Sequence, residues 1–260
     1  MKKLFLIALL FMFAVISCGA DDETDYESID DSTLSNDSDS DTDTGKNDPV
    51  VEEKEACDKK RTFKCKTDQT DGTEYSYICE GDTLYLYKYE TCKAGCNTST
   101  GKCNPWKDPD TGLTWSSLGI NKSSYRTGFY WDEAPKYCST LEENSLTGWH
   151  LPSIDELRTL IQNCPNTEPG GACKVSEKNG CLSKSECYSS SDCKCSEDKS
   201  GKYSKLGYSF YYGYGIWSSS TFIGTGYHEG EKMAWLVSFK SAVILEKKSD
   251  TTEYIRCVLK

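Results

Sequence analysis

The chain has 260 residues, 15 cysteines and a formal net charge of −11, and 37% of its residues are hydrophobic. The excess negative charge lies in residues 19–56, which hold 15 acidic residues and two lysines, whereas the chain from residue 57 onward is neutral. Nucleic-acid binding needs a basic surface that releases counterions from phosphates, and the folded part of this chain has no basic excess. We therefore expect no nucleic-acid partner.

Residues 1–17 have the form of a bacterial signal peptide. Two lysines precede an apolar run over residues 4–16, which is too short to span a membrane as a mature helix. The sequence Val15-Ile16-Ser17-Cys18 resembles a lipobox, and this resemblance implies that Cys18 is acylated after cleavage. An ordinary signal peptide that leaves a chance cysteine is the alternative. The lipobox therefore predicts that the protein is attached to a membrane through a lipid anchor, so the membrane is an expected partner.

Residues 18–56 follow as the lipidated cysteine and an acidic tether rich in Asp, Ser and Thr. Low hydrophobicity and high like charge cannot offset chain entropy, so we expect this segment to be disordered and extended. It would lift the rest of the protein from the membrane. Gly19 lacks the acidic retention signal of some bacteria, which favours a lipid-anchored location in the cell envelope, at the outer membrane or cell surface.

The cysteines beyond Cys18 fall into two even groups, six between Cys57 and Cys103 and eight between Cys138 and Cys257. In an exported chain, even groups indicate closed sets of disulfides. Zinc is the competing use of clustered cysteines, but an oxidising compartment favours bridges. We expect no metal and no other cofactor.

Residues 57–103, the six-cysteine module, form the first ordered domain. The segment "EYSYICEGDTLYLYKYETC" predicts two strands around Glu80-Gly81-Asp82, because apolar and polar positions alternate along it. A unit of this size builds little core, so three bridges would hold it together. Its expected role is that of a spacer or stalk.

Residues 104–260, the head, begin with a turn over residues 108–112 and a short strand. Asp132 is a plausible cap for a first helix with Pro135 in its first turn. A capping box of Ser153 and Glu156 predicts a second helix. The buried face of that helix is expected to consist of Ile154, Leu157, Leu160 and Ile161.

Strand patterns dominate after residue 206. The segments "YGIWSSS", "MAWLVSF" and "EYIRCVL" are rich in aromatic and β-branched residues and are separated by glycine-rich or charged turns. Helices followed by strands predict an α+β fold with an antiparallel sheet and helices on one side.

Six short motifs of the head occur together in a known order. This order resembles the Lcl C-terminal domain family and the related Fibrobacter paralogous domains, and the resemblance runs from about residue 106 to residue 258. It implies a C-type-lectin-like fold, shared with formylglycine-generating enzymes. The motifs are "TGLTW", "WDEAPKYCSTL", "GWHLPSIDEL", "IWSSS", "AWLVSF" and "IRCV".

The resemblance implies a bridge from the first helix to the last strand, between Cys138 and Cys257. Closing a loop of this length would contribute roughly 4 to 5 kcal/mol in the chain-entropy model. On the same fold, we expect Trp131, Trp149 and His150 to pack in the core rather than contact a ligand.

The tripeptides that bind calcium in sugar-binding lectins are absent, because Glu168-Pro169-Gly170 and Trp217-Ser218-Ser219 lack the necessary oxygens. An enzyme of the formylglycine-generating type would need a reactive cysteine pair late in the domain, and only Cys257 follows Cys195. We therefore expect no enzyme activity and no catalytic residues. This leaves a binding surface.

We expect non-catalytic binding of a glycan or an extracellular protein, in adhesion or recognition. A structural envelope protein without a soluble ligand is the alternative, and an enzyme is a more distant one. The glycine-flanked tyrosine segment, residues 207–215, has the composition of a recognition loop, although it could instead be a strand edge that covers the sheet. Its neighbour would be a cysteine loop, residues 164–195, that three bridges hold. The candidate ligand-binding residues are Tyr208, Phe210, Tyr211, Tyr212, Tyr214 and, in a separate loop, His228.

Overall fold

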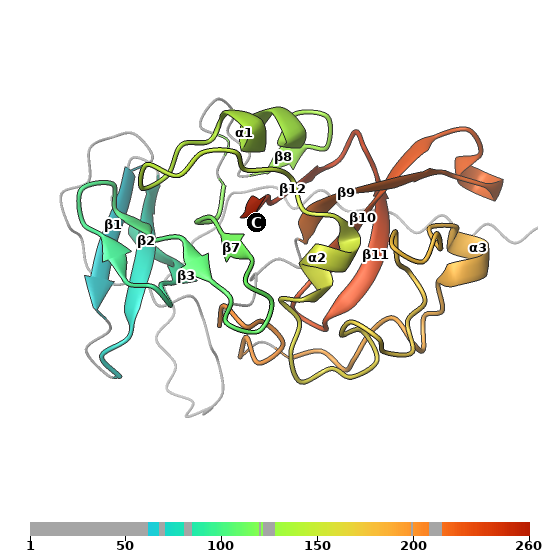
Figure 1. Ribbon diagram of the computed structural model, residues 1–260, viewed down its shortest axis with the longest axis horizontal. Coiled ribbons are helices and arrows are strands. Elements are labelled where there is room, and N and C mark those ends of the chain that lie inside the picture. Colours follow the sequence, from blue (N-terminus) through green and yellow to red (C-terminus); the bar gives the residue numbers. More distant parts are fainter. Residues whose placement is uncertain are drawn as a thin grey trace, which may run out of the picture. The chain divides into compact units, whose positions relative to one another are not determined.

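The computed structural model describes residues 62–67, 71–80, 85–119, 121, 128–198, 200–207 and 215–260. Within these residues the fold is a disulfide-rich α+β arrangement of small sheets and short helices, and every pair of named strands is antiparallel (Figure 1). No helix in this part of the chain is both long enough and apolar enough to cross a bilayer. The signal peptide, Cys18 and the acidic tether lie outside the described residues.

The six-cysteine module contributes a three-stranded sheet in the order β1-β2-β3 and a small hairpin of β4 and β5. The two strands expected around Gly81 are β2 and β3, and Tyr77, Ile78 and Cys79 on β2 are buried. The bounds are β1 (Thr62–Thr67), β2 (Glu74–Glu80), β3 (Tyr85–Thr91), β4 (Cys96–Asn97) and β5 (Lys102–Cys103).

The head contains three small sheets, of which the largest has the order β11-β10-β9. The second has the order β13-β7-β6, and the third pairs β12 with β8. A short 3₁₀ helix, η1 (Gly226–His228), lies between β9 and β10. The strand bounds are β6 (Trp106–Lys107), β7 (Thr114–Trp115), β8 (Phe129–Tyr130), β9 (Ile216–Ile223), β10 (Lys232–Ser238), β11 (Val243–Lys248), β12 (Thr252–Glu253) and β13 (Val258–Leu259).

The last predicted strand is broken into β12 and β13. Residues 253–258 are all buried in succession, so they do not alternate between a core face and a solvent face as one strand would. Between β12 and β13, Tyr254 and Ile255 form isolated bridges with Ile216 and Gly119, and Arg256, whose guanidinium is itself buried, belongs to no strand. The prediction of a continuous strand over residues 253–259 is therefore wrong.

The described part of the head also holds three α-helices, α1 (Ala134–Thr140), α2 (Ile154–Arg158) and α3 (Lys184–Cys187). Pro135 lies in the first turn of α1 as expected, but Asp132 is not its cap. Glu133 occupies the N-cap position without a side-chain cap bond, because a turn in which Ala134 N donates to Trp131 O delays the start of the helix.

The capping box of α2 is confirmed. Ser153 Oγ accepts a hydrogen bond from Glu156 N at 3.2 Å, and Glu156 Oε2 accepts one from Ser153 N at 2.9 Å. All four side chains of the predicted inner face are at most 2% exposed, but only Ile154 and Leu157 lie on α2, because the helix ends at Arg158 before Leu160 and Ile161. They pack in one core cluster with Trp115 and Trp235.

The three residues expected to pack in the core differ in how far they are buried. Trp149 is buried, and Trp131 packs against the same cluster while its Nε1 donates to Ser218 O at 2.8 Å. His150 differs, because its side chain is 44% exposed and its Nε2 lies 3.3 Å from Glu156 Oε2. The expectation of a core position for His150 is wrong, since the ring lies at the start of α2 beside the capping carboxylate.

Every bridge between described cysteines joins two members of the same group. In the head, Cys138 on α1 bridges to Cys257 beside β13 with 5.4 Å between Cα atoms, which is the pairing that the resemblance implies. Three more bridges, Cys164–Cys195, Cys173–Cys193 and Cys181–Cys187, close the cysteine loop. In the six-cysteine module the bridges are Cys65–Cys96 and Cys92–Cys103.

Strand β3 of the six-cysteine module lies against the head and supplies buried groups to it. Glu90 is 2% exposed, accepts hydrogen bonds from Leu118 N, and forms an ion pair with Arg256 Nη2 at 2.5 Å. The ring of Tyr89 meets that of Tyr254 edge to face with 6.3 Å between centroids. The module therefore does more than separate the head from the tether.

Candidate functional site

The predicted ligand-binding tyrosine segment falls mainly on residues that the structure does not describe. Tyr208, Phe210, Tyr211, Tyr212 and Tyr214 all lie outside the described residues. Its two flanking glycines are described. Gly207 O accepts a hydrogen bond from Thr91 Oγ1 at 3.1 Å, and Gly215 N donates to the buried carboxylate of Glu253 at 2.5 Å.

His228 lies in η1, on the loop between β9 and β10. Its Nδ1 is 2.7 Å from Glu231 Oε2, and Glu231 also pairs with Lys248 at 2.7 Å. The hydrogen bond from Lys248 holds the pKa of the Glu231 carboxyl below its usual value, desolvation opposes this effect, and the hydrogen bond from His228 adds to the lowering. The neighbouring Tyr227 is 95% exposed and its ring meets the imidazole edge to face. This loop therefore presents one exposed aromatic ring beside a charged network.

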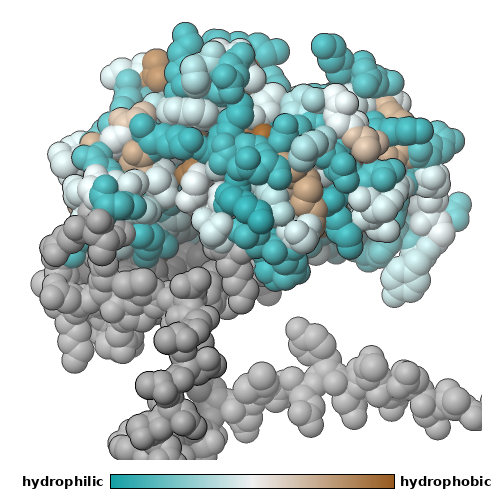
Figure 2. All heavy atoms as spheres, turned by 90° about the horizontal axis from the view of Figure 1, so that it is seen from below, coloured by the Kyte–Doolittle hydropathy of each residue, from teal (hydrophilic) through white to brown (hydrophobic). Residues whose placement is uncertain are grey.

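Exposed apolar groups are otherwise scattered. Among the described residues, the large hydrophobic side chains that are exposed are Tyr130, Leu146, Ile223 and Tyr227. On the face drawn in Figure 2, hydrophilic residues predominate and apolar residues occur as separate small patches. Single exposed apolar residues are ordinary on protein surfaces and mark no interface by themselves.

A pocket of about 670 Å³ lies between α2 and the cysteine loop. In Figure 1 this loop runs from the end of α2 out to α3. The volume is in the range of pockets that hold small organic ligands. The pocket is lined by Asp155, Arg158, Thr159, Pro169, Gly170, Gly171, Cys173, Lys174, Ser176, Lys178, Asn179 and Cys181.

Arg158, the last residue of α2, fixes the path of the loop around this pocket. It is 3% exposed, and its guanidinium donates to three backbone carbonyls, Thr167 O at 2.8 Å, Val175 O at 2.6 Å and Glu168 O at 2.8 Å. Burial lowers the pKa of this guanidinium, and the nearby Asp155 carboxylate works in the opposite direction. Because its hydrogen bonds go to backbone, Arg158 builds the pocket wall.

A second part of the loop is tied to the head through a small hairpin. Ser176 and Cys181 exchange backbone hydrogen bonds at 2.9 and 2.8 Å, and Asp155 Oδ2 accepts a hydrogen bond from Lys178 N at 2.8 Å. Glu177 Oε2 accepts one from Ser220 Oγ at 2.5 Å. With three bridges added, the rim of the pocket is positioned before any ligand arrives.

Two adjacent glycines on the rim differ in what they tolerate. A Cβ at Gly171 would lie 2.1 Å from Pro165 O and 2.5 Å from Asn166 O, so no larger residue fits there without moving backbone. Gly170 has open space but a φ of +84°, a conformation that disfavours residues with a side chain. Gly171 therefore allows the loop to fold closely back on itself beside the pocket.

The lining of the pocket has both apolar and polar surface. Thr159, Ser176 and Asn179 offer hydrogen-bonding groups, and the lining includes neither an aromatic residue nor a large aliphatic one. Among the described residues, the one group of three metal-capable side chains is Cys65, Cys92 and Cys96, which belong to bridges in the other module. The arrangement can bind a small polar group and shows no set of metal ligands around it.

Sequence reasoning found the cysteine loop but assigned recognition mainly to the tyrosines and missed the pocket-lining residues of α2. Asp155 and Arg158 follow the capping serine, and Arg158 is buried on α2 together with Ile154 and Leu157. The available signal was a charged pair on a short helix that leads into a long bridged loop. His228 is not among the pocket-lining residues.

Comparisons with known proteins identify one relationship. The model of the Lcl C-terminal domain family matches residues 105–259, which cover more than half of the chain. No curated protein and no solved structure matches the chain significantly.

Proposed function

The chain belongs to the Lcl C-terminal domain family, and from that premise we propose that it is a cell-envelope lipoprotein whose C-type-lectin-like head binds a glycan or a protein without catalysis. The observation that carries the proposal is the preformed pocket beside α2, whose walls are fixed by Arg158 and by three bridges. Recognition sites commonly lie on irregular segments held by a rigid scaffold.

Lectin-like topology is supported by the order of elements and by one bridge. Two helices, α1 and α2, precede the largest sheet of the head, and Cys138–Cys257 joins the first helix to the end of the chain. The long loop after α2 is then the segment expected to face a ligand, and the pocket lies on that loop.

The absence of catalysis is proposed on the chemistry of the nucleophiles and bases. The 13 described cysteines are all disulfide-bonded, so none of them offers a thiolate. The two histidines, His150 and His228, lie beside Glu156 and Glu231, and neither forms a hydrogen bond to a serine or threonine hydroxyl within the described residues. A serine or threonine nucleophile that relies on histidine as its base would need such a pair.

The envelope location rests on the sequence of the first 56 residues. Acylation of Cys18 would anchor the chain, and the acidic tether would extend it away from the lipid surface. Metabolic labelling with a fatty-acid probe tests this: the natural chain should be labelled and membrane-bound, and Cys18→Ala should release it. An unlabelled, soluble natural chain would contradict the anchor.

Binding is tested with the chain from residue 57 to residue 260 on arrays of glycans and extracellular proteins. Lys178→Trp fills the pocket with a bulky ring while keeping the backbone bond to Asp155, and Lys136→Trp makes the same change at an exposed site on α1. Binding of an array ligand should be lost in Lys178→Trp and retained in Lys136→Trp. A chelator should leave the affinity unchanged, because the calcium-binding tripeptides are absent.

The outcomes separate the candidate functions. If the affinity of a ligand is unchanged in Lys178→Trp, the recognition site lies outside the pocket. If no glycan or protein on the arrays binds, the result favours a structural envelope protein without a soluble ligand.

A further inference from the structure

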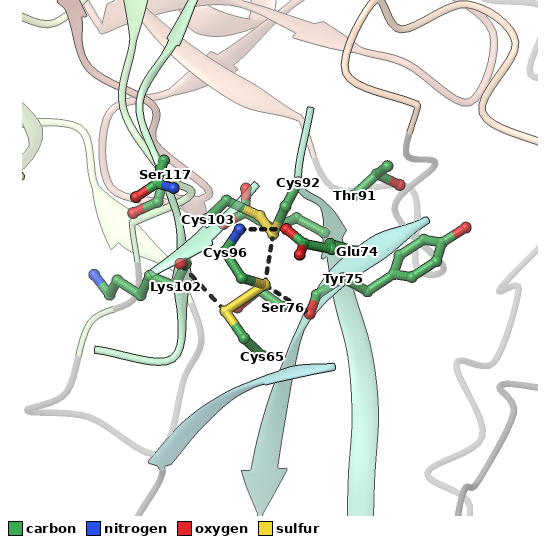
Figure 3. The surroundings of a disulfide bond; sticks show 12 residues. Cys65, Glu74, Tyr75, Ser76, Thr91, Cys92, Cys96, Lys102, Cys103 and Ser117 are labelled. Carbon is green, nitrogen blue, oxygen red and sulfur yellow. Dashed lines mark hydrogen bonds between the residues drawn. A yellow bond between two sulfur atoms is a disulfide. The ribbon is translucent and has the colours of Figure 1, made fainter. Parts of the chain in front are cut away.

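Four cysteines of the six-cysteine module form one contiguous sulfur cluster. The bridges Cys65–Cys96 and Cys92–Cys103 lie side by side, and Sγ of Cys96 is 3.5 Å from Sγ of Cys92 (Figure 3). The sulfurs of Cys65, Cys92 and Cys96 are all within 4.8 Å of one another, and the described residues contain no other such group of three cysteines.

One of these bridges is the more accessible. Cys65 and Cys96 are both half-buried, whereas Cys92 and Cys103 are 6% and 4% exposed. Each bridge of the head has at least one fully buried cysteine, and Cys138–Cys257 and Cys173–Cys193 have two. Attack by a thiolate on a disulfide depends on access to the sulfur. Among the bridges with both cysteines described, Cys65–Cys96 is the one in which neither cysteine is buried, so we expect a thiol from solution to attack it first.

Strand β1, which carries Cys65, packs beside β5, which ends at Cys103, and Cys65 Sγ lies 3.4 Å from the carbonyl oxygen of Lys102. Cys96 and Cys103 are paired residues of β4 and β5. The close sulfur contact between the two bridges is that of Cys96 with Cys92, whereas Cys103 does not belong to the group of sulfurs within 4.8 Å of one another. A partner exchange between Cys96 and Cys92 therefore needs the smallest movement.

We propose that this cluster is a site of thiol–disulfide exchange, with a low-molecular-weight thiol or an exposed protein thiol as its substrate. The incoming thiolate attacks Cys65 Sγ and forms a mixed disulfide, the Cys65–Cys96 bond breaks, and the electron pair leaves on Cys96 Sγ. The Cys96 thiolate then attacks Cys92 Sγ, so that a Cys92–Cys96 bond forms and Cys103 leaves as a thiolate.

Bonds and electrons balance without a net oxidant. Two thiol–disulfide exchanges have then occurred, so that the external thiol remains attached to Cys65 as a mixed disulfide and Cys103 is left as a thiolate.

Reduced glutathione added to the full chain tests the proposal. After acid quenching and alkylation, cleavage at lysine separates the four cysteines, since Lys64, Lys66, Lys93 and Lys102 lie between or beside them. We expect loss of the Cys65–Cys96 and Cys92–Cys103 peptides and gain of Cys92–Cys96, while the four head bridges remain. Earlier loss of a head bridge, or an opened Cys65–Cys96 with Cys92–Cys103 intact, would overturn the proposal.

A variant isolates the internal step. In Cys65→Ser the free thiol begins on Cys96, and exchange should move part of it to Cys103 with formation of a Cys92–Cys96 bond. The matched control is Cys187→Ser, in which the free thiol should stay on Cys181, because no third described sulfur lies within 4.8 Å of both members of that bridge. A thiol confined to Cys96 would contradict the exchange step. If Cys65→Ser does not fold, the glutathione experiment on the natural chain decides.

Discussion

Glu90 and Arg256 are 166 positions apart in the sequence and form an ion pair in which both side chains are almost completely buried. Arg256 Nη1 also donates to Ser116 O, and Glu90 accepts from Leu118 N. The family match begins at residue 105, so this carboxylate comes from a strand that precedes the matched domain. A buried charge depends on its partner, and here the partner belongs to the other module.

Removing one member of the pair should strongly destabilise the protein. Glu90→Gln or Arg256→Met leaves a buried charge without compensation, which typically costs about 3–5 kcal/mol. The free energy of unfolding should fall less in the double variant than the sum of the losses in the two single variants. Urea unfolding of residues 57–260 measures all three.

The exposed pair of Lys202 and Asp198 supplies the control, because Lys202→Met should leave the urea midpoint close to that of the natural chain. Single variants at Glu90 and Arg256 that unfold at the natural midpoint would show that the buried pair is dispensable.

Leu157 is fully buried at the centre of α2, and Leu157→Ala should cost roughly 2–5 kcal/mol through lost burial and a cavity. Leu146→Ala, at a side chain 37% exposed, is the matched change and should cost much less. Thermal unfolding distinguishes the two. Equal melting temperatures for Leu157→Ala and Leu146→Ala would contradict the position of α2 in the core.

The capping carboxylate should make stability depend on pH in acid. Burial acts to raise the pKa of Glu156, but the hydrogen bonds from Ser153 and the proximity of His150 outweigh it, and the pKa lies below its ordinary value. The stabilisation is present above the unfolded pKa and is lost as pH falls through the lower folded pKa. Glu156→Gln should flatten this part of a melting-temperature profile.

The matched control is Glu142→Gln at an exposed position. Its melting temperature should depend on pH in acid in the same way as that of the natural chain. An unchanged slope in Glu156→Gln would mean that other carboxyl groups set the acid response.

The two rim glycines should respond differently to alanine. Gly171→Ala forces backbone oxygens apart and should disturb the loop, whereas Gly170→Ala meets no atom and should cost only about 1 kcal/mol for its positive φ. Limited proteolysis of the cysteine loop reports the difference. Equal protection in both variants would show that the close approach at Gly171 is not required.

Tyr211→Ala and Tyr212→Ala test the tyrosine segment, which lies outside the described residues. If these rings contact a ligand, each variant should weaken binding to an array hit and leave the melting temperature nearly unchanged. Calorimetry on the same samples provides both readings. Variants that melt early and bind normally would identify the rings as core.

Local patterns made the start of α2 and the strands β9 and β10 predictable, because a capping box and apolar periodicity depend on neighbouring residues alone. Strand β11 was not predicted. The Glu90–Arg256 pair left no such trace, since its members share no local pattern. The role of Arg158 was equally hidden, because its partners are backbone carbonyls whose positions depend on the folded loop. The broken strand at Arg256 was missed for a related reason, because burial on both faces hides the period of two.

The anchoring of the cysteine loop by Arg158 has a consequence for how this surface can change over evolutionary time. Because the guanidinium binds carbonyl oxygens at residues 167, 168 and 175, and every amino acid carries such an oxygen, these three anchoring bonds do not depend on the side chains that line the pocket. Substitutions at the pocket rim can therefore alter what is bound without releasing the loop. A chain built in this way can acquire a new specificity while the cost in stability stays small.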